Sequence, residues 1–257
     1  MIEFVDVKKG FFEGTPDEIT VFESLNLKVE KGEFVSIVGS NGSGKTTLLN
    51  LVCGTYTPDS GKILVAGKDI TKMSEYKRAK KIGRVFQDTK KGSAPGLTIL
   101  ENMALADNKN HRYSLTPAIS KKRIDYFREL LSRCEMGLEN RLDVKVGALS
   151  GGQRQALALV LANMSDIEVL ILDEHTAALD PKSSEIIMNL TDKLIAEKKI
   201  TTLMVTHNLR HAASFGTRLL MMDKGRIVLD VSEKEKQETT VDKVLSLFNS
   251  ISIECGN

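Results

Sequence analysis

The chain has 257 residues, of which 41% are hydrophobic, 27% charged and 5% aromatic, the composition of an ordinary globular protein. Its formal net charge of +2 is too small to indicate a nucleic-acid or membrane-lipid partner. Three cysteines, Cys53, Cys134 and Cys255, are odd in number and unevenly spaced, which predicts a reducing compartment and neither a disulfide framework nor a zinc site. No apolar run approaches the roughly 18–20 residues that span a bilayer, and the first residues lack the form of a signal peptide. We therefore expect a cytosolic protein whose role at a membrane, if any, comes through a partner.

Apolar patterns in the first 90 residues predict several strands and one helix. Residues 21–29 alternate apolar and polar side chains, whereas residues 34–38 form a continuous apolar run that ends at Gly39. The expected elements are strands at 2–7, 21–29, 34–38 and 82–86, a hairpin at 62–70 turned around Ala66 and Gly67, and a helix over 45–52.

The pattern changes after about residue 88. The stretches 100–105, 116–136 and 151–163 have helical spacing without a convincing strand among them, which predicts a helical insertion over 88–163. Beyond it, the uniform apolar runs 169–172 and 202–205 are typical of buried parallel strands. A helix that opens at Pro181 should join these two strands as a crossover. Strands at 219–222 and 226–231 and a closing helix at 241–248 complete the expected order.

A phosphate-binding loop of the form G-x-x-x-x-G-K-S/T lies between the strand at 34–38 and the helix that follows. Its glycines let the backbone approach phosphates, and its amide groups and the helix N-terminus supply partial positive charge. Lys45 is expected to reach the β- and γ-phosphates and Thr46 to offer a hydroxyl to Mg²⁺. A harmless glycine turn is the alternative, and the flanking strand and helix argue against it. The expected phosphate-binding residues are Gly39, Ser40, Asn41, Gly42, Ser43, Gly44, Lys45, Thr46 and Thr47.

Two carboxylates, Asp173 and Glu174, come directly after the apolar run 169–172. Neighbouring residues at a strand end point in different directions, so one can serve a metal while the other faces an attacking water. We expect Asp173 to orient Mg²⁺, directly or through water, and Glu174 to act as the general base. Plain surface acidity is the alternative for this pair.

Two further polar residues follow predicted strands. His207 comes after the run 201–206 and is assigned to the γ-phosphate and the attacking water, although it could instead cap the next helix. Gln87 follows the strand at 82–86, where the helical insertion begins, and its amide can touch Mg²⁺ or water and report the nucleotide state to that insertion. The other histidines, His111, His175 and His211, are expected to be structural or solvent-exposed.

The segment Leu149-Ser150-Gly151-Gly152-Gln153 precedes the helix at 151–163. Ser150 is a good N-cap, which is the default interpretation of any such segment. The two glycines leave the helix N-terminus bare, however, which predicts a second anion-binding site. This second site lies roughly a hundred residues beyond the phosphate loop, so one copy of the chain is not expected to complete its own site.

With these motifs the chain resembles the ATP-binding subunit of ABC transporters over nearly its whole length. The resemblance is carried by the phosphate loop, Gln87, Leu149 to Gln153, Val169 to Glu174, Ala178-Leu179-Asp180 and Thr206-His207. It implies an α/β fold: a P-loop NTPase core with a mainly parallel sheet, an N-terminal antiparallel β subdomain and an inserted α-helical subdomain. The core would comprise about 1–87 and 164–257 of a single ATP-binding domain, and the helical subdomain about 88–163.

In that family two such subunits pair head to tail, and each ATP lies between the phosphate loop of one and the Ser-Gly-Gly segment of the other. The resemblance implies that Ser150, Gly151, Gly152, Gln153 and Asp180 contribute to this shared site, and that Gln87 senses the membrane subunit. It also places an aromatic ring on adenine near Phe11 and Phe12, of which Phe11 is favoured by its distance from the preceding strand. The implied cofactors are ATP and Mg²⁺. The implied partners are a second ATP-binding subunit, transmembrane permease subunits that hold the protein at the inner face of the cell membrane, and a substrate-binding protein.

One departure from the family pattern is His175, where the family usually has proline after the glutamate. The chemistry does not need that proline, so we expect only an altered loop stiffness. The stretches 92–99 and 173–182 resemble a bacterial importer subgroup that includes systems linked to aromatic amino acids such as tryptophan and tyrosine. Two alternatives stay open: a soluble ABC ATPase without a transport role, for example in cofactor assembly, and a nucleotide-dependent binding module without turnover.

Overall fold

The computed structural model describes residues 1–109, 119, 121–237 and 246. The chain forms two compact units, one made of Met1–Ala79 and Lys198–Asn257 and the other of Lys80–Glu197. The expected closing helix at 241–248 and the first part of the expected helix at 116–136 lie outside the described residues.

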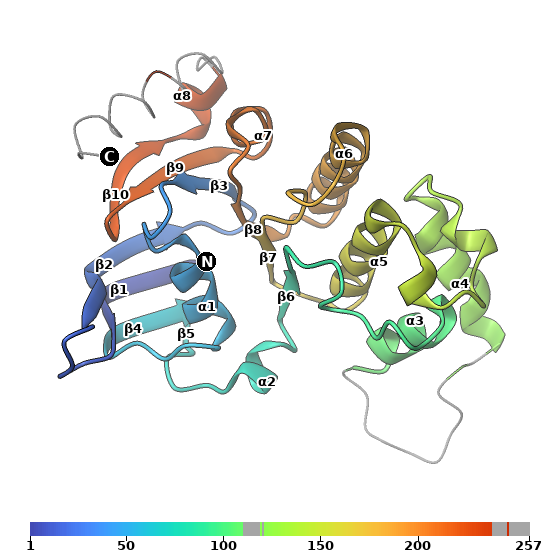
Figure 1. Ribbon diagram of the computed structural model, residues 1–257, viewed down its shortest axis with the longest axis horizontal. Coiled ribbons are helices and arrows are strands. Elements are labelled where there is room, and N and C mark those ends of the chain that lie inside the picture. The colour runs from blue at the N-terminus through green and yellow to red at the C-terminus, as the bar shows by residue number, and fades with distance from the viewer. Residues whose placement is uncertain (110–118, 120, 238–245, 247–257) are drawn as a thin grey trace. The chain divides into compact units, whose positions relative to one another are not determined.

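An antiparallel sheet with strand order β2-β1-β4-β5 opens the first unit (Figure 1). Its strands are β1 (Ile2–Phe11), β2 (Ile19–Val29), β4 (Ser60–Val65) and β5 (Lys68–Asp69). In β2 alternate residues such as Leu25, Leu27 and Val29 are buried, as a strand with one covered face requires. Ala66 and Gly67 both have positive φ, at 51° and 74°, as in a two-residue hairpin turn. The expected N-terminal antiparallel subdomain and its hairpin are therefore present.

The second sheet of this unit runs mainly parallel. The central strand β3 (Phe34–Gly39) pairs in parallel with β8 (Thr201–Val205) and with β9 (Arg218–Asp223), and β10 (Arg226–Val231) runs antiparallel to β9. Every residue of β3 and β8 is buried, which accounts for their uninterrupted apolar character.

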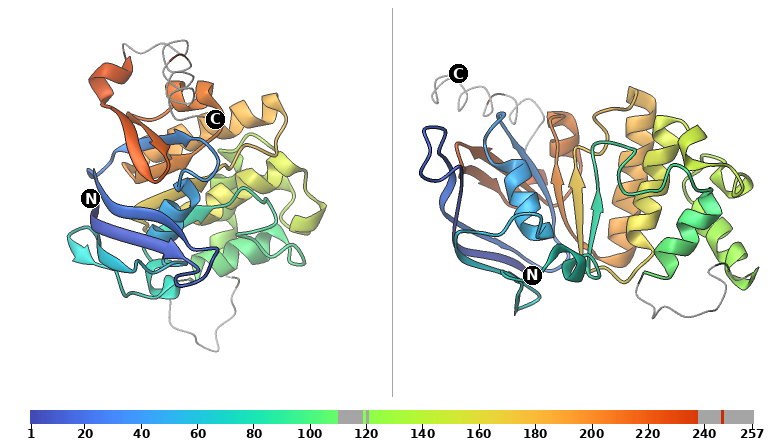
Figure 2. Two further views of the ribbon diagram at one scale, coloured as in Figure 1. Left: turned by 60° about the vertical axis from the view of Figure 1, so that its left-hand side comes forward. Right: turned by 60° about the horizontal axis from the view of Figure 1, so that its bottom comes forward.

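Helices cover both faces of β3. Helix α1 (Lys45–Cys53) packs against β3 and β8. Its N-cap residue, Gly44, lies against Phe22 of β2, so the helix sits between the two sheets of this unit (Figure 2). Helix α7 (Leu209–Ser214) covers the opposite face, where Val38 joins a cluster with Ala212 and Leu219. Two short helices, α2 (Glu75–Arg78) and α8 (Glu233–Gln237), complete the described part of the unit.

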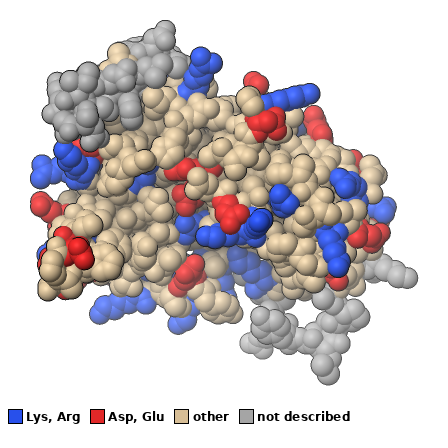
Figure 3. Space-filling view, in the orientation of Figure 1, with Lys and Arg blue, Asp and Glu red and all other residues tan. Residues whose placement is uncertain are grey.

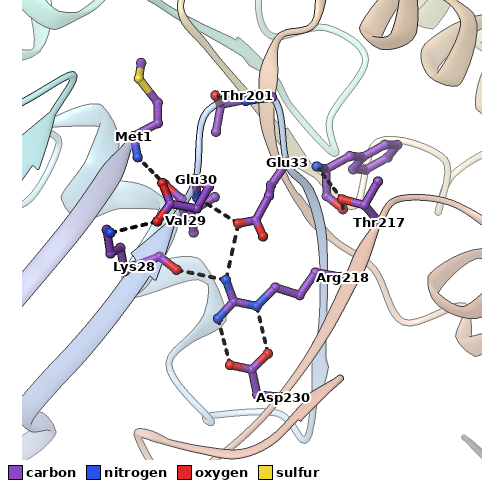
Figure 4. Close-up of polar contacts among 11 residues, drawn as sticks. Met1, Lys28, Val29, Glu30, Glu33, Thr201, Thr217, Arg218 and Asp230 are labelled. Atoms are coloured by element: carbon purple, nitrogen blue, oxygen red, sulfur yellow. Dashed lines mark hydrogen bonds and ion pairs between the residues drawn. The ribbon is translucent and has the colours of Figure 1, made fainter. Parts of the chain in front are cut away.

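Arg218 joins the two sheets of the first unit (Figure 4). Its guanidinium donates two hydrogen bonds of 2.7 Å to the Asp230 carboxylate, one of 2.8 Å to the Lys28 carbonyl and one of 3.3 Å to Glu33. The bonds to Asp230 are the main reason that the pKa of Arg218 is raised. Charge-assisted bonds with this fork geometry are among the stronger polar contacts in proteins, so this network holds the end of β2 against β9 and β10.

The second unit combines a parallel strand pair with helices. Strands β6 (Ile82–Val85) and β7 (Val169–Asp173) pair in parallel, and Val85 lies opposite Leu172. Its helices are α3 (Ile99–Asp107), α4 (Lys121–Ser132), α5 (Gly151–Asn163) and α6 (Pro181–Lys198), with 3-10 turns η1 (Leu138–Asn140) and η2 (Val146–Ala148). Helix α5 packs against β6 at Gly83, where a Cβ would lie 2.9 Å from the Ala162 carbonyl oxygen. A glycine is needed there because any side chain would push the helix away from the strand.

The described residues between 88 and 163 form helices and turns, with a single isolated bridge between Thr98 and Lys145. This agrees with the helical character expected for the insertion. Among the described residues no helix combines the length and apolar character needed to cross a bilayer. On the face drawn in Figure 3, basic and acidic side chains are interspersed, in keeping with the small net charge. Cys53 and Cys134 are buried free thiols, and burial raises the pKa of Cys134 to about 12, as for an unreactive core cysteine.

Candidate nucleotide-binding site

The loop between β3 and α1 has the backbone geometry that a phosphate loop needs. Gly39, Gly42 and Gly44 have φ values of 151°, 78° and 98°, which other residues rarely adopt. A Cβ on Gly39 would lie 2.1 Å from the Met222 carbonyl oxygen, and one on Gly44 would lie 2.7 Å from the Phe22 ring. Above Gly42, in contrast, no atom lies within 4 Å of the Cβ position. The loop is thus packed tightly beneath and open above, as a cradle for an anion must be.

Lys45 lies in the concavity of this loop. Its side chain is only 5% exposed, and Nζ donates hydrogen bonds of 2.8 Å to the Gly39 carbonyl and 2.7 Å to the Ser40 carbonyl. Ser43 Oγ lies 3.4 Å from the same nitrogen. A buried ammonium needs such acceptors, and they hold its charge against the phosphate loop.

The turn between β9 and β10 supports the phosphate loop from behind. Ser40 Oγ donates a 2.9 Å hydrogen bond to Asp223 Oδ1, and the Gly225 amide donates a 3.1 Å bond to the Ser43 carbonyl. A Cβ on Gly225 would lie 1.8 Å from the Val21 carbonyl oxygen, so the turn must carry glycine there. This support was not predicted from the sequence, although Asp-Lys-Gly after an apolar strand is itself a turn signal.

Arg78 holds the far end of α1. It is buried and donates hydrogen bonds of 2.6 Å and 3.1 Å to the Leu51 and Val52 carbonyls in the last turn of that helix. Burial lowers the pKa of Arg78. A cation at a helix C-terminus satisfies carbonyls that have no helical partner. Arg78 therefore fixes the helix whose other end forms the phosphate loop.

His207 also belongs to the first unit and lies two residues beyond the end of β8. The N-cap of α7 is Asn208, whose side-chain oxygen accepts from the Arg210 and His211 amides at 3.0 and 3.3 Å. Capping therefore does not account for His207, which is exposed just beyond the strand end. His207 thus lies near the carboxyl end of β8.

The ring favoured for adenine, Phe11, is the last residue of β1. It packs edge to face on Tyr56, with ring centroids 5.1 Å apart, and Lys9 Nζ lies 5.2 Å from its centroid. Phe12 lies beyond the strand with a φ of 58° and is 67% exposed. Of the two rings, Phe11 is held by its neighbours while still partly open to solvent.

In the second unit, Asp173 and Glu174 follow each other at the end of β7. Asp173 Oδ2 accepts a 2.8 Å hydrogen bond from Arg84 Nη2, across the β6–β7 pair. Glu174 has a φ of 47°, an uncommon conformation for a residue with a side chain. The backbone thus turns sharply between the two carboxylates.

Gln87 is exposed and lies two residues beyond the end of β6. The carbonyl of the preceding residue, Phe86, accepts a 3.3 Å hydrogen bond from Gln155 Nε2. Gln155 is on α5 and is 0% exposed. The segment that carries Gln87 is therefore tied to the helix that begins at the Ser-Gly-Gly sequence, a connection that the sequence did not reveal.

A capping box occupies two backbone amides at the N-terminus of α5, those of Ser150 and Gln153. Ser150 Oγ accepts from the Gln153 amide at 3.3 Å, and Gln153 Oε1 accepts from the Ser150 amide at 3.2 Å. Gln153 also donates from Nε2 to the Met136 carbonyl at 3.2 Å. Gln153 thus has a structural role in this segment, and its contact with nucleotide stays a prediction.

Asp180 caps α6. Its Oδ1 accepts a 3.0 Å hydrogen bond from the Ser183 amide, and the bonds with Ser183 lower the pKa of Asp180. The carboxylate is exposed at the helix start, and its predicted place at a dimer interface is not tested by this contact.

His175, the departure from the family pattern, is 2% exposed. Its Nε2 lies 3.3 Å from Thr191 Oγ1, and that hydroxyl donates its proton to the Ile187 carbonyl at 2.7 Å. Thr191 must therefore accept, so His175 Nε2 carries the proton. The loop after Glu174 is thus fixed to α6 by a buried histidine, a structural role.

The expected Mg²⁺ ligands, Thr46, Gln87 and Asp173, offer hydroxyl, amide and carboxylate oxygens, the donors that this hard cation prefers. Within the described part of the chain no group of three or more His, Cys, Asp or Glu residues could hold a metal unaided. A single carboxylate with hydroxyl and amide oxygens suits an ion that also binds nucleotide phosphates. The donor set therefore fits Mg²⁺.

Comparisons with known proteins agree with these motifs. The family model described as ABC transporter matches residues 22–177. A tyrosine transport ATP-binding protein of Clostridioides difficile is 46% identical over 248 residues, which are 96% of this chain and 98% of the relative. A methionine import ATP-binding protein of Bacillus cereus is 32% identical and matches over 97% of this chain and 73% of its own length.

A solved structure is similar as well. It is a dimeric ATP-binding cassette in a post-hydrolysis state, bound to ADP and phosphate, with a TM-score of 0.78 and 31% identity over 91% of this chain and 99% of that one. The expected P-loop NTPase fold with its helical insertion is thereby confirmed. The chain belongs to the ABC transporter family, as an ATP-binding cassette that hydrolyses ATP.

Proposed function

We propose that this protein is the ATPase subunit of a membrane importer for a small solute, with amino acids as the favoured class. The observation that carries the proposal is the 46% identity, over almost the whole of both chains, with a tyrosine transport ATP-binding protein. The methionine import relative supports the same direction of transport. The region 92–99 and the region 173–182, which resemble an importer subgroup, add to this support.

The active form proposed here is a head-to-tail homodimer. Each ATP lies between the phosphate loop of one subunit and the capped N-terminus of α5, at Ser150 to Gln153, of the other. The bare amides of Gly151 and Gly152 at that helix start suit a γ-phosphate. Asp180 is exposed at the start of α6, and in the proposed dimer it belongs to the same interface. The dimeric state of the solved relative supports this arrangement.

Each residue of the site has a distinct part in hydrolysis. Phe11 stacks on adenine, and Lys45 with the loop amides holds the β- and γ-phosphates. Glu174 accepts a proton from the water that attacks the γ-phosphorus, and His207 holds the γ-phosphate and that water in line. Thr46, Gln87 and Asp173 would hold Mg²⁺, which supplies charge neutralisation at the phosphate oxygens.

Coupling to transport runs through the region 88–163, which we propose as the helical subdomain that docks on permease subunits. Gln87 immediately precedes this region, and the hydrogen bond from Gln155 to the Phe86 carbonyl ties the segment around Gln87 to α5. In this proposal, hydrolysis or release of the γ-phosphate moves Gln87, and the hydrogen bond between the Phe86 carbonyl and Gln155 passes that movement to α5. Through the permease the protein is held at the inner face of the cell membrane, where a substrate-binding protein on the other side delivers the solute.

Reconstitution tests this proposal. The protein is co-expressed with the permease encoded beside it, purified as a complex and placed in proteoliposomes with the substrate-binding protein. With the substrate-binding protein on the opposite side, ATP-driven accumulation of labelled tyrosine, tryptophan or another amino acid is expected on the side that carries the cassettes. The alternative, a soluble ABC ATPase in cofactor assembly, would hydrolyse ATP without copurifying with any polytopic membrane protein. Efflux in place of uptake would overturn the proposed direction.

A further inference from the structure

The ion pair between Arg84 and Asp173 has no assigned role in the proposed hydrolysis. Arg84 Nη2 and Asp173 Oδ2 are 2.8 Å apart, and the side chains are 14% and 13% exposed. Both come from strands, Arg84 from β6 and Asp173 from the last position of β7. Arg84 pairs in register with Ile171, and Asp173 lies two residues further along β7. Residues two apart on a strand point to the same face, so the ion pair is a diagonal contact across the two strands.

The surroundings of Arg84 strengthen the pair. Its guanidinium carbon lies 4.6 Å from the centroid of the Phe86 ring, within the range of a cation–π contact. An ion pair that is largely removed from water costs desolvation energy, and this cost is offset only when geometry and neighbouring contacts are good. The desolvation cost of this ion pair suggests that Arg84 serves the function of the Asp173 carboxylate and does not only stabilise the fold.

We propose that Arg84 is an internal counter-cation for Asp173 that competes with Mg²⁺ for this carboxylate. The inference rests on the proposed function, in which Asp173 orients Mg²⁺. Without the metal, Arg84 neutralises a carboxylate that is largely removed from water. When Mg²⁺ binds with ATP, the metal takes over that neutralisation, and the bond from Arg84 to Oδ2 weakens or breaks. Arg84 is thus a positioning residue that sets how much Mg²⁺ the cassette needs.

The competition has two measurable consequences. Without metal and nucleotide, loss of Arg84 leaves Asp173 uncompensated, so the protein should unfold at a lower temperature. With metal and nucleotide, loss of the competing cation should make Mg²⁺ binding easier. A hydrogen bond to a charged group corresponds to about a tenfold change in affinity or more, so we expect the half-saturating free Mg²⁺ concentration to fall about tenfold.

The experiment compares full-length wild type with Arg84→Met. A fluorescent, non-hydrolysable ATP analogue is titrated at fixed protein while free Mg²⁺ is varied, and thermal unfolding is recorded in EDTA and in saturating Mg²⁺ with the analogue. Arg84→Met should lower the half-saturating Mg²⁺ concentration about tenfold and lower the unfolding temperature more in EDTA than in the loaded state. Arg84→Gln, which keeps a donor without the charge, supplies the same test if the methionine variant does not fold.

Arg218→Met is the matched control, since Arg218 is 17% exposed in its own ion-pair network (Figure 4). It should lower the unfolding temperature alike in both states and leave the half-saturating Mg²⁺ concentration unchanged. An unchanged or increased Mg²⁺ requirement in Arg84→Met would overturn the inference. Weaker binding of the analogue in EDTA would also overturn it, because Arg84 would then serve the phosphates. If the wild-type protein bound the analogue equally well with and without Mg²⁺, that result would contradict the proposed Mg²⁺ site itself and not only the role of Arg84.

Discussion

The hydroxyl of Ser40, in the phosphate loop, donates a 2.9 Å hydrogen bond to the carboxylate of Asp223 at the end of β9. Asp223 is buried, so its carboxylate needs hydrogen-bond donors, and the Ser40 hydroxyl is one of them. Together with the bond from the Gly225 amide to the Ser43 carbonyl, this contact fixes the loop at two points. Residues near the C-terminal end of the described chain thus shape a site near its beginning.

Asp223→Ala should therefore weaken nucleotide binding. The substitution leaves Ser40 Oγ without its acceptor, and a lost buried hydrogen bond of this kind costs about 1–3 kcal/mol. We expect the KM for ATP to rise several-fold with a smaller change in kcat, because the reacting groups are untouched. Steady-state kinetics measure this, with Asp230→Ala as the control for a carboxylate in the same sheet that does not touch the loop. A KM equal to that of wild type would show that the turn does not support the loop.

Glu174→Gln should reduce ATP hydrolysis by about 10²–10⁴-fold, the range for loss of a general base. The amide keeps the shape of the side chain but cannot take the proton from water. ATP binding should persist, and the dimer should become more stable because it is not opened by hydrolysis. Phosphate release and size-exclusion chromatography with ATP measure the two effects. Near-normal turnover in this variant would remove Glu174 from its proposed role.

Gln155→Met should separate stability from turnover. The substitution removes the bond to the Phe86 carbonyl, which costs about 1 kcal/mol, but it also removes a buried Oε1 that has no hydrogen-bond partner among the described residues. The two effects oppose each other, so the free energy of unfolding should change by less than about 1 kcal/mol. Turnover should fall, because the segment that carries Gln87 is no longer tied to α5. Chemical denaturation and an ATPase assay on the same samples measure the two effects. A variant that loses stability but keeps full ATPase activity would contradict the prediction.

The cap on α6 should be sensitive to acid. The pKa of Asp180 is lowered by its bonds with Ser183, so the folded state binds this proton less readily than the unfolded state. The stabilisation is present above the ordinary pKa of the aspartate and is lost as pH falls through the lowered value. Asp180→Asn can still cap the helix but cannot titrate, so it should flatten this part of the stability profile below about pH 4. Thermal unfolding between pH 2 and pH 6 measures the difference, and parallel profiles for the two proteins would contradict it.

Local signals predicted much of the fold. Helix α5 begins and ends where expected, at Gly151 and Asn163, because the Ser150 and Gln153 side chains define its start. The hairpin at Ala66 and Gly67 was also predicted, since its residues tolerate positive φ. Helices α2 and α8, with four and five residues, were not expected, because so few residues show no periodicity.

Contacts between distant segments could not be predicted. The pairing of Arg84 with Asp173 depends on the register of β6 and β7, which no local pattern specifies. The same holds for the bond between Ser40 and Asp223, whose partners are 183 residues apart. The motifs thus named the residues of the proposed site, while the side chains that position them are known only from the structure.

The central claim is that two subunits grip each γ-phosphate. Mixing two inactive variants tests it most directly: Lys45→Ala, which lacks the phosphate lysine, and Ser150→Arg, which blocks the helix start with a bulky side chain. In a mixed dimer one composite site has both lesions and the other has neither, so ATPase activity should return to as much as about half of wild type per mixed dimer. Activity in a lone wild-type protomer that does not self-associate, together with no recovery in the mixture, would contradict the account.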